Sequence, residues 1–394
     1  LVAQLEGEYT SSDLIQEVIY DTRKIIRTTG VAFFALNGPK QSGHQYIQKA
    51  YELGVRYFVV EKLPLENYPA AVFLKVTDTL KALQKLAKSR REHIKYPIVA
   101  IAGSIGKTTV KEWIHHLLAG QLHVVRSPKS YNSQLGVALS LLELPLDADL
   151  ALIEAAATKP GEMAALQAMI QPQFGIITNC LIRGNEFKDT SQFEAEIQVL
   201  MEECSWVLDG EKIQIENKIP FDELVENIPF KDPASIQNAK IAIACALQFG
   251  KISQKNVTSL PRLALRLETI DGVNDSVLIN DSYTLDLVAF EGSLAYLKTL
   301  AVGKKPMVCC YLKSDQKEQQ EAIESLIKAC GIDEYYFWEG LNQDLPILNN
   351  HVVLIKGNDY LVTEKLLENW RLKKHSTSVS YDLSALDHNL KRYQ

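Results

Sequence analysis

Short apolar runs alternate with helical stretches along most of the chain. The runs are rich in β-branched and aromatic residues, as at 31–36 and 55–60, and the stretches between them space their apolar residues three or four positions apart. A short apolar run indicates a strand, whereas spacing of three and four indicates a helix. Regular alternation of the two predicts parallel sheets with crossover helices, so we expect an α/β fold.

The alternation restarts along the chain and divides it into three α/β units. A chain of 394 residues is too long for one compact core, and typical domain sizes predict two or three domains. A charged helical stretch at 80–94 is predicted to connect the first unit to the second, and a new alternation begins around 260–266. We place the domains at 1–88, 89–261 and 262–375, followed by a tail at 376–394.

The elements expected in the second and third units are specific enough to place candidate residues. In the second unit we expect strands at 97–102, 123–126, 150–153, 175–178 and 206–208 and helices at 107–118 and 134–142. In the third unit we expect strands at 277–281, 307–312 and 352–355 and helices at 287–297, 317–330 and 360–370. The chemical candidates described next lie mainly at the ends of these strands.

Composition narrows the classes of partner. Hydrophobic residues make up 46% and charged residues 23%, which is ordinary for a folded globular protein. The formal charge of -6 argues against a continuous basic face for nucleic acid. A small phosphorylated ligand stays open, because its site needs only a few cations and backbone N–H groups.

The six cysteines indicate the redox state of the compartment in which the protein is found. They form no C-x-x-C pair and have no histidine at zinc spacing, so we expect buried free thiols and a cytoplasmic protein. No apolar run reaches the roughly 18 residues that span a bilayer, and we expect no membrane partner. The first residue is Leu rather than Met, which leaves an original targeting segment open.

The sharpest chemical signal is the segment Gly103-Ser104-Ile105-Gly106-Lys107-Thr108-Thr109, which follows a predicted strand and opens a predicted helix. Its two glycines allow the backbone to curl so that consecutive N–H groups point at phosphate oxygens. Lys107 would place a positive charge at the β- and γ-phosphates, and Thr108 would offer a hydroxyl to Mg²⁺. The segment is shorter than the usual phosphate loop G-x-x-x-x-G-K-[ST], because Ile101 occupies the position of the first glycine. We predict an ATP site; a glycine turn that merely precedes a helix is the other interpretation.

A carboxylate follows the predicted strand 150–153. From this position Glu154 could reach a metal ion held by Thr108. A cap or a loop residue is the competing interpretation, and position alone favours neither.

With the phosphate loop in place, the chain resembles the Mur ligase family over nearly its whole length. The stretches that carry the resemblance are 21–24, 33–36 with 43–44, 103–113, 127–137, 154, 160–163, 178–179, 266–268, 280–283 and 354–357. The resemblance implies three domains: a first for the uridine diphosphate end of the substrate, a central sheet like that of P-loop ATPases for ATP and Mg²⁺, and a Rossmann-like third that brings in a dipeptide. It also implies a reaction, the joining of D-alanyl-D-alanine to UDP-N-acetylmuramoyl-tripeptide through an acyl phosphate in peptidoglycan synthesis.

The resemblance also assigns roles to individual residues. Lys107 and Glu154 carry over as a phosphate-binding group and a metal ligand, and Asn132 and Ser133 fall in the loop that faces the reacting carboxylate. The other assignments are nucleotide contacts from Gly103, Ser104, Gly106, Thr108, Thr109, Asn238, Asp281 and Tyr283, metal binding by Thr108, and contacts near the uridine nucleotide from Asp21, Thr22 and Arg23. For Tyr131, Tyr283 and Phe34, ordinary aromatic packing is an equal alternative.

Two departures from the family pattern concern the metal. The family places a histidine after Thr178-Asn179, but 180–187 contains none. The family also has a carbamylated lysine on the next helix. In this chain Glu196 falls at that position, with Glu194 two residues before it. A glutamate could imitate the charge and the two oxygens of the carbamate and act as a metal ligand. Solvated acids on a surface helix are the equal alternative.

Two further departures concern the rest of the chain. The family's Asn-rich run after 281–283 is replaced by Thr284-Leu285-Asp286, and its arginine after Lys356-Gly357 is missing, which weakens the clamping of phosphate or carboxylate. The segment between Cys204 and Asn238 is shorter than is usual in the family, although peripheral hairpins and loops tolerate deletion.

The stretches 375–377 and 381–390 resemble the opening strand and helix of an alanine racemase, as in the fused ligase and racemase proteins of some bacteria. Two hypotheses therefore stand beside each other: an active ATP-dependent ligase, and a degenerate ligase-like domain that serves the fused racemase as scaffold or regulator. A folate-type polyglutamate ligase shares the phosphate loop but not the match at 127–137, and ranks last.

Overall fold

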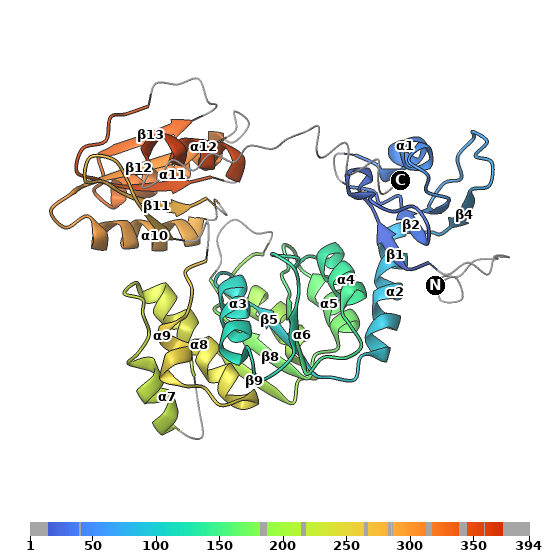
Figure 1. The fold of residues 1–394 in the computed structure, drawn as a ribbon, viewed down its shortest axis with the longest axis horizontal. Coiled ribbons are helices and arrows are strands. Elements are labelled where there is room, and N and C mark those ends of the chain that lie inside the picture. Colours follow the sequence, from blue (N-terminus) through green and yellow to red (C-terminus); the bar gives the residue numbers. More distant parts are fainter. Residues whose placement is uncertain are drawn as a thin grey trace, which may run out of the picture. The chain divides into compact units, whose positions relative to one another are not determined.

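The computed structural model describes residues 15–38, 41–181, 187–213, 218–263, 267–282, 285, 287–312, 317–338, 345–357 and 359–372. These residues form two compact units, which divide between Pro261 and Arg262. The sheets are almost wholly parallel and are connected by helices, so the predicted α/β class is confirmed (Figure 1). In the part of the chain that the structure describes, no helix combines the length and the apolar character needed to cross a bilayer.

The first unit contains two sheets, and the first of them has four parallel strands in the order β1-β2-β3-β4. Phe33 of β2 packs into a cluster with Ile47 and Ala50 of helix α1, whereas its neighbour Phe34 packs on the opposite face. Alternating side chains of a strand point to opposite faces, so both faces of this sheet are covered. The elements are β1 (Glu17–Ile19), η2 (Thr22–Lys24), β2 (Val31–Phe34), η3 (Gly43–Tyr46), α1 (Ile47–Glu52), β3 (Tyr57–Val60) and β4 (Val72–Lys75).

Helix α2 (Thr79–His93) joins this sheet to the next one. It begins where the Asp78 carboxylate accepts a hydrogen bond from the Lys81 N–H (2.9 Å), which satisfies one of the free amides of the first turn. Its apolar face, which includes Leu83 and Leu86, lies in the same cluster as Phe34. The two sheets of the first unit therefore share one continuous core.

The second sheet has five parallel strands in the order β6-β7-β5-β8-β9. Strands β5 and β7 are buried along their whole length, which explains why the sequence at 98–102 is an unbroken apolar run. The side chain of Ala100 faces the cluster that contains α2, and that of Ile101 faces the opposite cluster. The strands are β5 (Ile98–Ala102), β6 (Val124–Arg126), β7 (Leu150–Glu154), β8 (Phe174–Ile177) and β9 (Trp206–Asp209).

Helices cover both faces of this second sheet (Figure 1). One face carries α2 with α4 (Gln134–Glu143), α5 (Glu162–Ile170) and α6 (Thr190–Met201). The other carries α3 (Lys107–Leu118) and α8 (Pro233–Phe249), with α7 (Lys218–Val225) and α9 (Gln254–Thr258) beside them. Trp113 of α3 stacks on Phe230 with ring centroids 4.7 Å apart, and this contact closes the α3 side of the core.

The second unit is a single five-stranded sheet in the order β10-β11-β14-β12-β13, in which only the edge strand β10 runs antiparallel to its neighbour. Its strands are β10 (Glu268–Asp271), β11 (Val277–Asp281), β12 (Lys305–Tyr311), β13 (Glu334–Trp338) and β14 (His351–Lys356). Its helices are α10 (Leu287–Leu300), α11 (Lys317–Ala329) and α12 (Tyr360–Trp370). Apolar clusters lie on both faces of the sheet, which makes it an independent α/β layer structure.

Candidate active site

The phosphate loop lies where chain connections leave the second sheet in opposite directions. Strand β5 connects through α3 to β6 on one side, while its neighbour β8 connects through α6 to β9 on the other. Ligands bind parallel sheets at such switch points, beyond the carboxyl ends of the strands. The loop 103–106 follows β5 at this edge, beside the end of β8.

Both glycines of the loop are required by the backbone. Gly103 has φ of 124° and Gly106 has φ of 87°, values in the left-handed region that other residues adopt only with strain. A Cβ at Gly103 would lie 2.2 Å from Thr178 Oγ1, and a Cβ at Gly106 would lie 2.3 Å from Asn238 Oδ1. Asn238 on α8 therefore packs directly against the loop, the neighbourhood expected for a nucleotide contact.

The loop is anchored to the end of β8. Ser104 N–H donates to the Asn179 carbonyl (3.1 Å), and Ile105 N–H donates to the Asn179 side-chain oxygen (3.3 Å). The Thr178 hydroxyl donates to the Ile105 carbonyl (2.7 Å), and the Ser104 hydroxyl donates to the carbonyl of Leu181. These bonds hold the curled backbone in place before any ligand binds, which lowers the entropic cost of binding.

Lys107 begins helix α3 and folds back over the loop. Its Nζ donates to the carbonyls of Gly103 (2.7 Å) and Ser104 (2.8 Å). The ammonium charge thus lies at the start of α3, where the positive end of the helix dipole and the first-turn amides of Thr108 and Thr109 also favour an anion. The arrangement suits a phosphate group.

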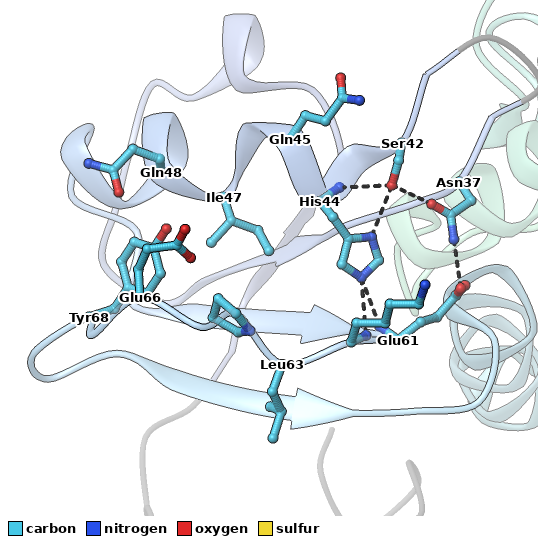
Figure 2. A pocket seen from close by; sticks show the side chains of 12 residues that line it. Asn37, Ser42, His44, Gln45, Ile47, Gln48, Glu61, Leu63, Glu66 and Tyr68 are labelled. Atoms are coloured by element: carbon cyan, nitrogen blue, oxygen red, sulfur yellow. Dashed lines mark hydrogen bonds between the residues drawn. The ribbon is translucent and has the colours of Figure 1, made fainter.

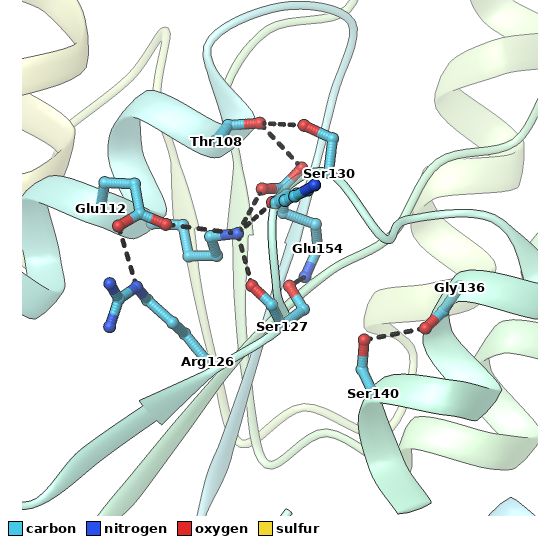
Figure 3. A network of polar contacts seen from close by, with 10 residues as sticks. Thr108, Glu112, Arg126, Ser127, Ser130, Gly136, Ser140 and Glu154 are labelled. Carbon is cyan, nitrogen blue, oxygen red and sulfur yellow. Dashed lines mark hydrogen bonds and ion pairs between the residues drawn. The ribbon is translucent and has the colours of Figure 1, made fainter. Parts of the chain in front are cut away.

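Thr108 stands at the centre of a cluster of oxygen atoms (Figure 3). Its hydroxyl donates to Glu154 Oε2 (3.1 Å) and shares a hydrogen bond with the Ser130 hydroxyl (2.9 Å). Glu154 ends β7 and its side chain is fully buried. The predicted pairing of Thr108 with Glu154 is therefore present, and Ser130 adds a third oxygen that sequence reasoning did not select.

This cluster fits Mg²⁺, because magnesium in ATP sites is held by one or two carboxylates, hydroxyls and the phosphates themselves. Glu154 Oε1 is buried and has no well-aligned hydrogen-bond donor, although Lys111 Nζ lies 2.9 Å from it. A buried carboxylate oxygen without an aligned donor favours a cation ligand. Among the described residues, no group of three or more His, Cys, Asp and Glu side chains is placed to hold a metal ion.

Lys111 is the main residue that sequence reasoning missed. Its side chain is fully buried, and Nζ donates to the carbonyls of Ser127 (2.7 Å) and Lys129 (2.5 Å). It also lies 3.5 Å from Glu112 Oε1, whose partner oxygen pairs with Arg126 (2.8 Å, Figure 3). Its position was visible in the sequence, because Lys111 falls between the apolar residues 110, 113 and 114 of an amphipathic helix.

Asn132 and Ser133 lie on the loop between β6 and α4, beside the oxygen cluster. The Ser133 hydroxyl accepts a hydrogen bond from Gly136 N–H (3.2 Å) and so caps α4. The Asn132 backbone donates to the Ser130 carbonyl (2.9 Å) and accepts from Ala156 N–H (2.9 Å), just beyond Glu154. The loop therefore stands next to the metal-binding candidates.

Glu196 has other partners in the structure. Its carboxylate accepts from Gly161 N–H (2.6 Å) and Met163 N–H (3.2 Å), at the start of α5. Both carboxylate oxygens are therefore occupied by backbone amides, as in a helix cap supplied by a different helix. A metal role for Glu196 stays a prediction that would require these bonds to be exchanged.

Asp21, Thr22 and Arg23 form a compact turn in the first sheet. Asp21 accepts from Arg23 N–H (3.0 Å) and pairs with the Arg23 guanidinium (2.7 Å), which lowers the pKa of Asp21. Next to them, Lys24 Nζ donates to the hydroxyl of Tyr131 (3.2 Å). This bond lowers the pKa of Tyr131 and connects the turn to the loop that carries Asn132.

A separate cavity of about 420 Å³ lies beside the first sheet (Figure 2). His44 stands in its wall: Nε2 accepts from the amides of Glu61 (3.0 Å) and Lys62 (3.3 Å), so the proton resides on Nδ1, which faces Ser42 Oγ (3.1 Å). Burial lowers the pKa of His44, which keeps the ring neutral. The cavity is lined by Asn37, Ser42, His44, Gln45, Ile47, Gln48, Glu61, Lys62, Leu63, Pro64, Glu66 and Tyr68. Asp21, Thr22 and Arg23 do not contribute to this wall.

Asp281 lies in the second unit and forms a buried ion pair. Its Oδ2 accepts from Lys356 Nζ (2.6 Å) and from the Ser293 hydroxyl (2.5 Å), and its Oδ1 accepts from Leu267 N–H (3.3 Å). Both carboxylate oxygens of Asp281 thus have hydrogen-bond donors within the second unit. The nucleotide contact expected for Asp281 stays a prediction. Tyr283 lies outside the described residues.

Comparisons with known proteins agree with this geometry. Residues 101–192, which contain the phosphate loop and Glu154, match the family model described as Mur ligase middle domain. This part of the chain is therefore similar to the middle domain of Mur ligases.

The chain is similar to ligases named MurF. It is 27% identical over 363 residues to the UDP-N-acetylmuramoyl-tripeptide--D-alanyl-D-alanine ligase of Bacillus subtilis, a match that covers 81% of this chain and 77% of the relative. The Escherichia coli protein of the same name is 32% identical over 177 residues, 44% of this chain and 38% of the relative. A crystal structure of MurF from Acinetobacter baumannii has a TM-score of 0.72 at 21% identity and covers 90% of this chain and 93% of that one. MurF ligase from Thermotoga maritima in complex with ADP has a TM-score of 0.69 at 17% identity, with coverage of 91% and 98%.

Proposed function

We propose that this chain is an ATP-dependent amide ligase that joins D-alanyl-D-alanine to UDP-N-acetylmuramoyl-tripeptide in peptidoglycan synthesis. The reaction is that named for its sequence relatives. The observation that carries the proposal is the assembly of Lys107, Thr108 and Glu154 at one edge of the second sheet. Phosphoryl transfer needs mainly charge neutralisation and positioning, and this edge offers both.

In this reaction the tripeptide carboxylate attacks the γ-phosphorus of ATP, which releases ADP and forms an acyl phosphate. The amine of D-alanyl-D-alanine then attacks the acyl carbon and expels inorganic phosphate, which leaves an amide. Lys107 and the first-turn amides of α3 would hold the triphosphate, because the Ser104 and Ile105 amides already donate to Asn179, while Asn132 and Ser133 lie at the loop where the carboxylate would approach. Thr108 and Glu154 would hold Mg²⁺, which supplies positive charge to the phosphates when bound.

A steady-state assay tests the proposal. ADP release should require both the UDP-linked tripeptide and D-alanyl-D-alanine, because the acyl phosphate is consumed only by the amine. Lys107→Ala should weaken ATP binding by about 10- to 100-fold, the loss expected for a charge-assisted contact. Lys88→Ala, at an exposed lysine of α2, is the matched control and should bind ATP normally. Nucleotide binding without turnover would refute the ligase and support the inactive scaffold, which neither the assembled site nor the relatives favour.

The proposal includes a cytoplasmic location, supported by cysteines that are all unpaired and that suit a reducing compartment. It also retains a fused alanine racemase, supported only by the sequence resemblance of the tail, because 373–394 lies outside the described residues. The mass and the racemase activity of the protein isolated from its natural source would decide this last point. A protein ending near this tail, without racemase activity, would contradict the fusion.

A further inference from the structure

Lys111 is a buried cation with a precise set of partners that the proposed reaction does not use. It lies one helical turn beyond Lys107 on α3, but its ammonium points into the protein, where its exposed fraction is 0%. Two of its three N–H donors go to the carbonyls of Ser127 and Lys129, on either side of Pro128. Nζ also forms an ion pair with Glu154 Oε1 at 2.9 Å, without an aligned hydrogen bond.

We propose that Lys111 is a positioning residue that fixes the loop 127–133 against Glu154 and thereby places Asn132 and Ser133 for the reacting carboxylate. One ammonium group connects three segments that are distant in sequence: helix α3, the loop after β6 and the end of β7. The catalytic part of this proposal rests on the ligase function proposed above, whereas the part that concerns the loop does not.

The loop needs such a restraint because its backbone is strained. Lys129 has φ of 50°, a left-handed conformation that a residue with a Cβ adopts only when its surroundings hold it. Its carbonyl accepts the 2.5 Å hydrogen bond from Lys111. A charge-assisted bond from a buried, immobile donor is a strong restraint on that peptide group.

Restraint at Lys129 reaches the predicted catalytic residues through the chain itself. The next residue, Ser130, presents its hydroxyl to Thr108 (2.9 Å) and its carbonyl to Asn132 N–H (2.9 Å). Ser133 then opens α4 as its cap. A shift of Lys129 would therefore move Ser130 away from Thr108 and carry Asn132 with it.

Charge around Lys111 is balanced by neighbours from each packed element. Glu154 contributes one carboxylate, and Glu112 contributes another at 3.5 Å, which is itself paired with Arg126. Removing Lys111 alone would leave Glu154 as an uncompensated buried charge, which is strongly destabilising. The test therefore compares variants that share a neutral side chain at 154.

The decisive comparison is between Glu154→Gln and the double variant Lys111→Met/Glu154→Gln, which differ only at Lys111. Lys129 is exposed, so trypsin can cleave after it once the loop opens, and cleavage after the exposed Lys62 serves as an internal reference. We expect cleavage after Lys129, followed by mass spectrometry, to be about tenfold faster in the double variant, because local opening no longer breaks the two ammonium hydrogen bonds. Equal cleavage rates in two folded variants would overturn the proposal. This readout needs no ligase activity, so it stands even if the proposed function fails.

The catalytic part has its own readout in Lys111→Met, which keeps the Glu154 carboxylate that the reaction needs. Because the unpaired carboxylate lowers stability, this variant is assayed at a temperature where circular dichroism shows it to be folded. We expect kcat to fall by about 100-fold, while KM for ATP and the affinity for ADP in EDTA change by less than about threefold, because the loop 103–106 has separate anchors. Lys88→Met is the control at an exposed position. A loss of ADP affinity as large as the loss of kcat would show a general structural defect and would overturn the positioning role. An unchanged kcat would overturn it as well.

Discussion

The buried pair of Lys356 and Asp281 in the second unit allows a stability prediction with a defined sign and size. The Lys356 side chain has an exposed fraction of 0% and that of Asp281 11%, and their Nζ and Oδ2 atoms are 2.6 Å apart. Breaking a buried pair by removing one partner costs about 3–5 kcal/mol, because the other charge stays buried without compensation. The two possible single variants, however, leave very different partners behind.

In Lys356→Met, Asp281 keeps hydrogen bonds from the Ser293 hydroxyl (2.5 Å) and Leu267 N–H (3.3 Å). In Asp281→Asn, the partners that the described residues leave to Lys356 are a neutral amide oxygen at 281, a long contact to the Ser293 hydroxyl (3.4 Å) and the face of the Phe290 ring at 5.8 Å. We therefore expect a loss of about 3 kcal/mol for Lys356→Met and about 5 kcal/mol for Asp281→Asn, the two ends of the range for broken buried pairs. The double variant should recover to within about 1 kcal/mol of the wild type, because it leaves no unpaired buried charge.

Urea unfolding measures these differences. With an m-value of about 2 kcal/mol/M, the transition of the second unit should move by about 1.5 M for Lys356→Met and by about 2.5 M for Asp281→Asn. Because the chain has two units, the transition should be assigned by hydrogen exchange of β11, β12 and β14 rather than by total fluorescence. Additive losses in the double variant, or equal losses in the single variants, would show that the pair is not the source of the stability.

Three further outcomes follow from the described residues. Gly106→Ala should lower the free energy of unfolding by about 1–2 kcal/mol, because alanine is strained in the left-handed backbone of this position. It should also weaken ADP binding in calorimetry, because the added Cβ would lie 2.3 Å from Asn238 Oδ1. Unchanged ADP affinity would contradict the loop geometry. Burial lowers the pKa of His44 below its ordinary value of 6.5, so the unfolded chain binds the proton more readily than the folded chain. The contribution of His44 to the free energy of unfolding is therefore complete above pH 6.5 and is lost as the pH falls through the lowered pKa of the folded state. The urea midpoint of His44→Gln should therefore depend less on pH between 7.5 and 5.5 than that of the wild type, and parallel curves would contradict this. Burial raises the pKa of Cys310 to about 12 and the pKa values of Cys180 and Cys204 to about 11. These thiols should therefore react slowly with an aromatic disulfide reagent at pH 8 in the native protein and rapidly in urea. Rapid reaction of the native protein would show that they are not shielded.

The alternation of strands and helices could be predicted from the sequence because buried parallel strands are continuous apolar runs. The run before the phosphate loop becomes β5, and the stretch expected at 107–118 is α3 with the same bounds. Short edge strands are harder to recognise, since β1 and β13 have few buried residues and are defined by their neighbours. The glycine loop was predictable because left-handed backbone and close approach leave glycine as the residue that fits.

The partners of charged residues could not be predicted in the same way. Nothing local in the sequence indicates that Lys356 reaches Asp281 or that Glu196 caps α5, because each contact joins segments distant along the chain. The proximity of Thr108 and Glu154 could be expected because carboxyl ends of neighbouring parallel strands converge at one sheet edge, whereas their shared metal ion stays a prediction. The ammonium of Lys111 beside them was missed because a lysine at a helical position is usually solvated.

The two lysines of α3 show how one helix can serve a ligand and a scaffold at the same time. Lys107 holds its charge over the phosphate loop, whereas Lys111, four residues later on the same face, directs its charge into the protein. A buried ion pair is seldom the most stable choice, since apolar side chains of similar volume often do as well or better. If the pair of Lys111 and Glu154 served stability alone, Lys111→Met/Glu154→Gln would hold the loop 127–133 as firmly as Glu154→Gln does. We expect instead a folded chain with a loosened loop, because the carbonyls of Ser127 and Lys129 lose the buried ammonium that holds them.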